Sequence, residues 1–129
     1  MKRNMDLVRA ILLFVENQDV NSGQYENITL DGYTPMEVMM HVKIMEGYGL
    51  LQDCTYYLRG NTTVRTITWE GYDYLDKVRD NTIWKKTKDT IVSNGLPLIF
   101  DTIKTVSTAF IAAATEGVVN AILKNGGQQ

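Results

Sequence analysis

The run Thr34-Pro35-Met36-Glu37 constrains the fold of this chain more than any other stretch. A threonine hydroxyl can accept a hydrogen bond from the backbone N–H three residues later, and a glutamate there can accept one in return from the threonine N–H. Proline fits the first helical position because the N–H that it lacks would have no partner there. The run therefore predicts a helix that begins at Thr34.

This helix needs a buried face and a stop, and the sequence contains both. Val38, Val42 and Met45 are spaced to lie on one face of a helix. Gly47 and Gly49 end it, and Gly49 suits the left-handed backbone conformation that closes many helices. The span from Thr34 to the end is about 15 residues, or about 22 Å at 1.5 Å per residue, which leaves room for one helix only.

The flanking segments predict further short elements. A first helix is capped by Asn4, a short strand covers residues 28–30, a hairpin pairs residues 50–58 with 64–69, and Thr68 caps a third helix. The apolar stripe of the third helix loses phase near residues 81–82, which indicates a kink or a break. Pro97 can open a last helix.

This order of elements is that of a winged helix-turn-helix domain without the helix that normally crosses the DNA backbone. Residues 17–27 could supply one turn of the missing helix. We therefore predict an α+β, mainly helical fold. Residues 1–95 form a reduced winged-helix-like domain (helix, short strand, helix, β-hairpin wing, helix), and residues 96–129 form a C-terminal helical arm that is loose after residue 123.

Composition excludes several classes of function. The 129 residues suit a single core, and a formal net charge of -2 creates no general attraction to nucleic acid. The single cysteine excludes an intramolecular disulfide and favours a reducing compartment. Charged residues interrupt the first apolar segment, and no run approaches the ~20 apolar residues that span a bilayer. We expect a cytoplasmic protein without membrane contact.

Catalysis has few candidate residues. One histidine and one cysteine cannot form a zinc cluster within one chain, and no glycine-rich phosphate loop is present. His41 is expected to be a hydrogen-bonded residue at the edge of the core, and Cys54 a small core residue, rather than an acid-base group and a nucleophile. The carboxylates at 70–80 fit exposed ion pairs better than a metal site. We expect no enzyme activity, metal or cofactor.

Three blocks carry a resemblance to a known family: "MKRNMDLVRAILL", "GYTPMEVMMHVKIMEGYGLL" and "TITWEGYDYLDKVRDNTIWKKTK". Together they are similar to the bacterial and prophage family called domain of unknown function 2513, over roughly residues 1–90. The resemblance implies a compact winged-helix-like fold, a phage or prophage origin and a bacterial host cell, but no activity. Tyr48 stands where the family usually has alanine, and Tyr72 where it often has histidine, so no role of that histidine carries over.

The outer face of the Thr34 helix has few groups that read DNA. Met36, Met40 and Lys43 lie opposite the buried stripe, where a DNA-reading helix normally carries Arg, Asn, Gln, Ser or Lys near its N-terminus. Exposed methionines suit an adaptable protein contact, whereas a methionine stripe can equally belong to the core. DNA contacts, if DNA is the partner, would come from Lys43, Arg59, Arg65, Lys85, Lys86 and Lys88, although such residues are also ordinary surface chemistry.

The last helix has the strongest signal for self-association. Residues 110–114 are apolar all round, so the helix must be buried on its own domain or against a second copy, and small alanines permit close approach. A membrane-surface role is weaker because Lys104 and Lys124 are its only cations. We predict a homodimer through Ile103, Val106, Phe110, Ala114 and Val118.

These observations favour a small, non-enzymatic phage or prophage protein that acts by binding. The leading hypothesis is a protein-interaction or regulatory module with a protein partner. The alternative is a winged-helix DNA-binding transcriptional regulator.

Overall fold

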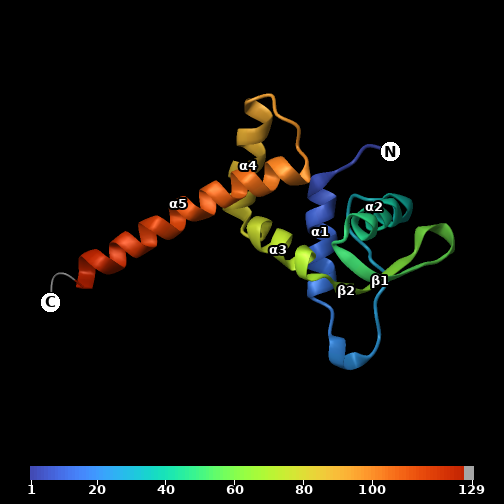
Figure 1. Ribbon diagram of the computed structural model, residues 1–129. Helices are drawn as coiled ribbons and strands as arrows, with labels where there is room; N and C mark the ends of the chain where they lie inside the picture. The colour runs from blue at the N-terminus through green and yellow to red at the C-terminus, as the bar shows by residue number, and fades with distance from the viewer. Residues whose placement is uncertain (127–129) are drawn as a thin grey trace. The chain divides into compact units, whose positions relative to one another are not determined.

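A computed structural model describes residues 1–126 of the chain (Figure 1). The predicted mainly helical α+β fold is confirmed, and the described residues contain one two-stranded sheet. The chain divides into two compact units, Met1–Asp76 and Lys77–Gln129, which we call the N-terminal unit and the C-terminal unit. This division falls earlier in the chain than the boundary predicted at residue 95. Residues 127–129 of the predicted loose tail lie outside the described residues.

Helix α1 (Met5–Glu16) begins as the sequence predicted. The Asn4 side chain accepts hydrogen bonds from the backbone N–H groups of Asp6, at 2.9 Å, and Leu7, at 3.1 Å. The inner face of α1 packs against α2 and β2, because its apolar side chains recur at helical spacing. The buried residues of this face are Met5, Leu7, Val8, Ile11, Leu12 and Val15.

Helix α2 (Pro35–Tyr48) has the predicted capping box at its start. Thr34 Oγ1 accepts from Glu37 N–H at 3.2 Å, and Glu37 Oε1 accepts from Thr34 N–H at 3.3 Å. The predicted inner stripe is confirmed, since Val38, Val42 and Met45 are buried. Gly49 ends the helix with φ 98°, a conformation that glycine adopts without strain.

Strands β1 (Leu51–Tyr56) and β2 (Thr62–Ile67) form the predicted antiparallel hairpin, with Leu51 opposite Ile67 and a short 3₁₀ turn, η2 (Leu58–Gly60), near its tip. The hairpin packs against α2.

The predicted strand at residues 28–30 is wrong. Ile28 N–H donates to the Thr62 carbonyl at 2.9 Å, as a third strand would require. The N–H of Thr62, however, donates to the Asn27 side-chain oxygen at 2.8 Å instead of to a backbone carbonyl. The side chain thereby replaces the backbone partner that a third strand would need. Residues 17–27 do contain a turn, the 3₁₀ segment η1 (Val20–Ser22).

Helix α3 (Trp69–Val78) starts at a close approach between three elements. The Thr68 hydroxyl accepts from Gly71 N–H at 3.0 Å, which confirms the predicted cap, and donates to the carbonyl of Gly49 at the end of α2. Gly71 leaves no room for a side chain, because a Cβ there would overlap the Leu50 carbonyl oxygen. The start of α3 is thus fixed against the junction of α2 and β1.

The predicted irregularity near residues 81–82 is a full break. Helix α3 ends at Val78, and Asp80 caps α4 (Asn81–Ser93) by accepting from Ile83 N–H at 2.8 Å. Helix α5 (Phe100–Gly126) packs against α4.

Helix α5 begins at Phe100 and not at Pro97. The Thr102 hydroxyl accepts from Ile99 N–H at 3.2 Å and so gives a partner to the backbone donor just before the first helical residue. The helix continues to Gly126 and so includes residues 124–126, which were predicted to belong to a loose tail.

A pair of glycine variants tests the close approach at the start of α3. Gly71→Ala forces a methyl group against the Leu50 carbonyl, so we expect the free energy of unfolding to fall by about 1–3 kcal/mol. Gly47→Ala, on α2 with nothing within 4 Å of its Cβ, should instead raise it by up to about 1 kcal/mol. Urea unfolding followed by circular dichroism measures both, and equal stability of the two variants would contradict the packing at Gly71.

Candidate protein-interaction surface

The outer face of α2 presents a row of large apolar side chains to solvent. Met36, Met40, Ile44 and Tyr48 recur every four residues along one side of the helix and are 39–52% exposed. We call these four residues the α2 stripe. Exposure of such a row to water is unfavourable, and this free energy is recovered when another molecule covers the row.

The α2 stripe partly matches the sequence prediction. Met36, Met40 and Lys43 are exposed, as predicted for an outer face. Ile44 and Tyr48 were missed, although they continue the four-residue spacing that Met36 and Met40 begin. Lys43 lies beside the stripe with its Nζ 5.1 Å from the centre of the Tyr56 ring, a cation–π contact.

The hairpin tip adds exposed apolar residues near the start of α2. Leu58 is 89% exposed and Tyr57 is 54% exposed. Gly60 packs on the backbone at the start of α2, since a Cβ there would lie 2.6 Å from the Pro35 carbonyl carbon. The tip is thereby held against the end of α2 at which the stripe begins.

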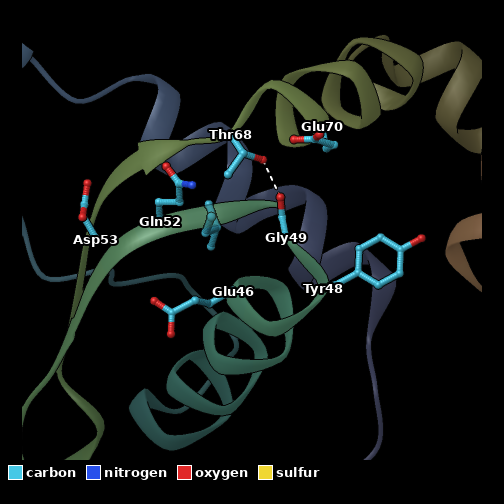
Figure 2. A pocket seen from close by; sticks show the side chains of 8 residues that line it. Glu46, Tyr48, Gly49, Gln52, Asp53, Thr68 and Glu70 are labelled. Carbon is cyan, nitrogen blue, oxygen red and sulfur yellow. Dashed lines mark hydrogen bonds between the residues drawn. The ribbon is translucent and has the colours of Figure 1, made fainter.

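A cleft of about 790 Å³ opens where α2 ends, and Figure 2 shows the side chains around it. Tyr48, the last residue of the α2 stripe, is one of its walls. Three carboxylates line the cleft and come from three elements: Glu46 from α2, Asp53 from β1 and Glu70 from α3. The other lining residues are Gly49, Leu51, Gln52 and Thr68.

The charged side chains that line the cleft are all acidic. Among the described residues that line it, none is lysine or arginine. The C-terminal end of α2 adds partial negative charge from the helix dipole. Within residues 1–126, no group of three or more His, Cys, Asp or Glu side chains is arranged to hold a metal ion, so the three carboxylates do not converge on one point.

The two units carry opposite charge. The N-terminal unit has six Lys and Arg against eleven Asp and Glu, a formal charge of -5, and the C-terminal unit has seven against four, a charge of +3. The two values add to the net charge of -2 for the whole chain. The near-neutral average therefore conceals a strongly acidic N-terminal unit.

His41 has a structural role inside the N-terminal unit. The side chain is 1% exposed, and its Nε2 accepts from the backbone N–H of Asn4 at 2.9 Å. Its Nδ1 lies 2.8 Å from the Glu37 carbonyl, so Nδ1 carries the proton. The ring joins the start of α1 to α2, which confirms the prediction of a hydrogen-bonded histidine, although the residue lies deeper than the predicted edge of the core.

Cys54 is a half-buried thiol rather than a fully buried core residue. Burial, together with the hydrogen bond to Glu46 and the charge of Glu46, raises its pKa to about 12. The Tyr56 hydroxyl donates to Glu46 Oε1 at 3.2 Å, and burial together with the charges of Cys54 and Glu46 also raises the pKa of Tyr56. The Cys54 thiol is therefore protonated at neutral pH, which suppresses nucleophilic reactivity.

The residues predicted for DNA contact are divided between the two units. In the N-terminal unit, Lys43, Arg59 and Arg65 are exposed, and the Arg65 guanidinium lies 4.7 Å from the centre of the Tyr25 ring. In the C-terminal unit, Lys85 and Lys86 are exposed on α4, whereas Lys88 is half-buried with its Nζ 5.3 Å from the Trp84 ring centre.

The residues predicted for self-association occupy two environments along α5. Ile103 is fully buried and has no surface to offer a second copy, so its inclusion was wrong; Val106 and Phe110 are half-buried. Ala114 and Val118 are exposed and line a groove of about 340 Å³ in the C-terminal unit. Every residue from 112 to 125 is exposed. Self-association itself stays a prediction.

Helix α5 combines a length of 27 residues with a mainly apolar composition. Over residues 100–125 its length and composition alone are sufficient to cross a bilayer, and only 6% of its most apolar 18 residues are buried. The expectation that no run approaches this length was therefore wrong. By contrast, Glu116, Asn120 and Lys124 form a polar row at intervals of four on the exposed half.

Comparison with known proteins identifies the relatives of this chain. It matches the family model described as "Hypothetical protein (DUF2513)" over residues 2–97. A Haemophilus influenzae protein named "Uncharacterized protein" is 36% identical over 114 residues, which cover 87% of this chain and 97% of the relative. No solved structure matches. The resemblance predicted from the three sequence blocks is confirmed, and α5 (Phe100–Gly126) lies beyond the matched residues.

The raised pKa of Cys54 predicts slow alkylation of the native thiol. With a pKa of about 12, about one thiol in 10⁴ is ionised at pH 8, compared with about a quarter for an ordinary cysteine. We expect iodoacetamide to react at least ~100-fold more slowly with the native chain than with the chain in urea. Glu46→Gln removes a cause of the shift and should speed the native reaction; equal native and unfolded rates would contradict the raised pKa.

Proposed function

This chain belongs to the DUF2513 family, and we propose that it acts, without catalysis, by binding a protein partner through the α2 stripe. One observation carries the proposal: four large apolar side chains are exposed at intervals of four on a helix whose opposite face is fully buried. The buried face and the capping box hold the backbone of α2 in place. The stripe is therefore a fixed surface rather than a loop that must order on binding.

The chemistry of the α2 stripe suits a protein surface. Methionine adapts its shape to different partners, and tyrosine supplies a large contact area with few rotatable bonds. Burial of side chains that are 39–52% exposed contributes about 1 kcal/mol each, so the stripe supplies a useful part of a binding energy. An interaction or regulatory module of phage or prophage origin in a bacterial host is the role that we propose.

We also propose that a second copy of the chain covers the exposed half of α5. Val118, Val119, Ile122 and Leu123 are 46–67% exposed, and their burial contributes on the order of 4–7 kcal/mol per copy. Two copies together approach the roughly 4–15 kcal/mol that association costs in lost freedom. The groove beside Ala114 and Val118 can accept side chains of the second copy.

DNA binding is the second candidate function. The exposed Arg59 at the hairpin tip and the exposed Lys85 and Lys86 of α4 are the observation in its favour. The charge of -5 on the N-terminal unit repels phosphate, and this unit contains both α2 and the hairpin that would enter the grooves. Protein binding is therefore the better-supported function.

The variant Met40→Asp tests the α2 stripe. A charge in the middle of the row should abolish capture of the partner from host lysate, because the aspartate would be desolvated in the interface. The melting temperature should change little, since Met40 is 39% exposed. Val92→Asp is the matched control: it also places a charge at an exposed apolar helix position, 65% exposed on α4, and should leave capture intact.

Two results would contradict the role of the stripe. A large loss of thermal stability in Met40→Asp would place Met40 in the core. If a random-sequence selection enriched one DNA duplex, and Arg59→Ala weakened binding to it while Met40→Asp did not, the function would be DNA recognition. Nuclease treatment of the lysate before capture separates direct protein contacts from contacts through nucleic acid.

The double variant Val118→Asp, Ile122→Asp tests the second copy on α5. Sedimentation velocity should show a dimer for the full chain and a monomer for the variant, because two charges enter the apolar contact. A monomeric full chain that floats with phosphatidylglycerol vesicles would contradict the proposal and assign α5 to a membrane. Val92→Asp again serves as the control and should remain dimeric.

A further inference from the structure

The α2 stripe and the acidic cleft are parts of one surface. Tyr48 is the last residue of the stripe and also lines the cleft. From Met36 to Tyr48 the stripe covers twelve helical steps, or about 18 Å at 1.5 Å per residue. A segment that follows the stripe toward the end of α2 therefore arrives at the cleft.

The charge of this surface specifies what can occupy the cleft. Glu46, Asp53 and Glu70 are exposed carboxylates that three different elements place around the cleft. Two of them already accept one hydrogen bond each from a neighbouring hydroxyl: Glu46 from Tyr56 at 3.2 Å, and Asp53 from Thr66 at 3.3 Å. Each carboxylate has further acceptor positions for a cationic donor.

We infer that this surface takes a protein segment with an apolar face that ends in lysine or arginine, the apolar face on the α2 stripe and the cation in the cleft. The inference rests on the proposed function and adds the chemistry of the partner. Helical segments of about 12 residues match the length of the stripe. Lysine and arginine suit the cleft because both combine a long apolar stem, which can lie on Tyr48, with a charged end.

Other classes of partner fit this surface less well. Nucleic acid and anionic lipid would bring negative charge toward three carboxylates and a unit with a formal charge of -5. An acidic protein segment would meet the same repulsion. A purely apolar segment could cover the stripe but would leave the cleft without a counter-charge.

Two synthetic peptides probe the charge of the partner. Both are 16-residue amphipathic helices with leucine at positions i, i+4 and i+8; one ends in three lysines and the other in three glutamates. Fluorescence anisotropy with the full-length chain measures both affinities. At low salt we expect the lysine peptide to bind at least about tenfold more tightly, and the difference should shrink at 0.5 M salt because exposed charges are screened.

Variants of the chain test the contributions of the cleft and of the α2 stripe to peptide binding separately. The double variant Asp53→Asn, Glu70→Gln should reduce the advantage of the lysine peptide to about twofold or less. The matched control Glu26→Gln, Asp31→Asn removes the same charge from exposed positions outside the cleft and should keep the advantage. Met40→Asp should weaken binding of both peptides.

The outcomes distinguish this inference from the proposed function. Equal affinities for the two peptides, both lost in Met40→Asp, would overturn the inference about charge while supporting the stripe as a binding surface. An equal loss of preference in the cleft variant and its control would also overturn the inference, because overall charge would then be the cause. Tight binding of the lysine peptide that Met40→Asp leaves unchanged would contradict the proposed function, and binding of neither peptide would overturn the inference.

Discussion

The hydroxyl of Thr68 holds together the part of the molecule on which the candidate surface depends. It accepts from Gly71 N–H at the start of α3 and donates to the Gly49 carbonyl at the end of α2. Gly71 packs on the Leu50 carbonyl, so α3 begins against the turn that joins α2 to β1. The Thr68 hydroxyl and the packing of Gly71 together fix the three elements that supply the carboxylates of the cleft. Rigid placement matters because charged groups held apart in a fixed array select a partner by its charge.

Helix α2 contributes residues to the core on one face and presents the α2 stripe to solvent on the other. Val38, Val42 and Met45 are fully buried, and His41 links this side of α2 to the start of α1. The α2 stripe then follows a spacing of four, which rotates by about 40° per step around the helix. The stripe therefore winds gradually along the outer face and reaches the cleft at Tyr48, the point where the helix ends.

The sequence predicted the helix starts well because a cap is a local interaction between residues two or three positions apart. The predicted caps Asn4, Thr34 and Thr68 all accept hydrogen bonds from backbone N–H groups two or three residues later. The predictions failed where a residue distant in the sequence determines the local structure or the burial of a side chain. The strand at 28–30 is absent because the Asn27 side chain takes a donor of β2, and Ile103 was assigned to an interface although it is buried. The cleft joins residues 46–70 through tertiary contacts, so no spacing rule could have found it.

Net charge was the sequence property that described the functional surface least well. A value of -2 suggests a chain without electrostatic preference, whereas the compact units carry -5 and +3. At physiological ionic strength a charge acts over about 8 Å, so a partner at the α2 stripe experiences the local carboxylates and not the average of the chain. In the proposed complex, hydrophobic burial on the stripe supplies affinity without regard to sequence. The acidic cleft beside it would supply the selection, because a like charge there opposes binding while a cation is attracted.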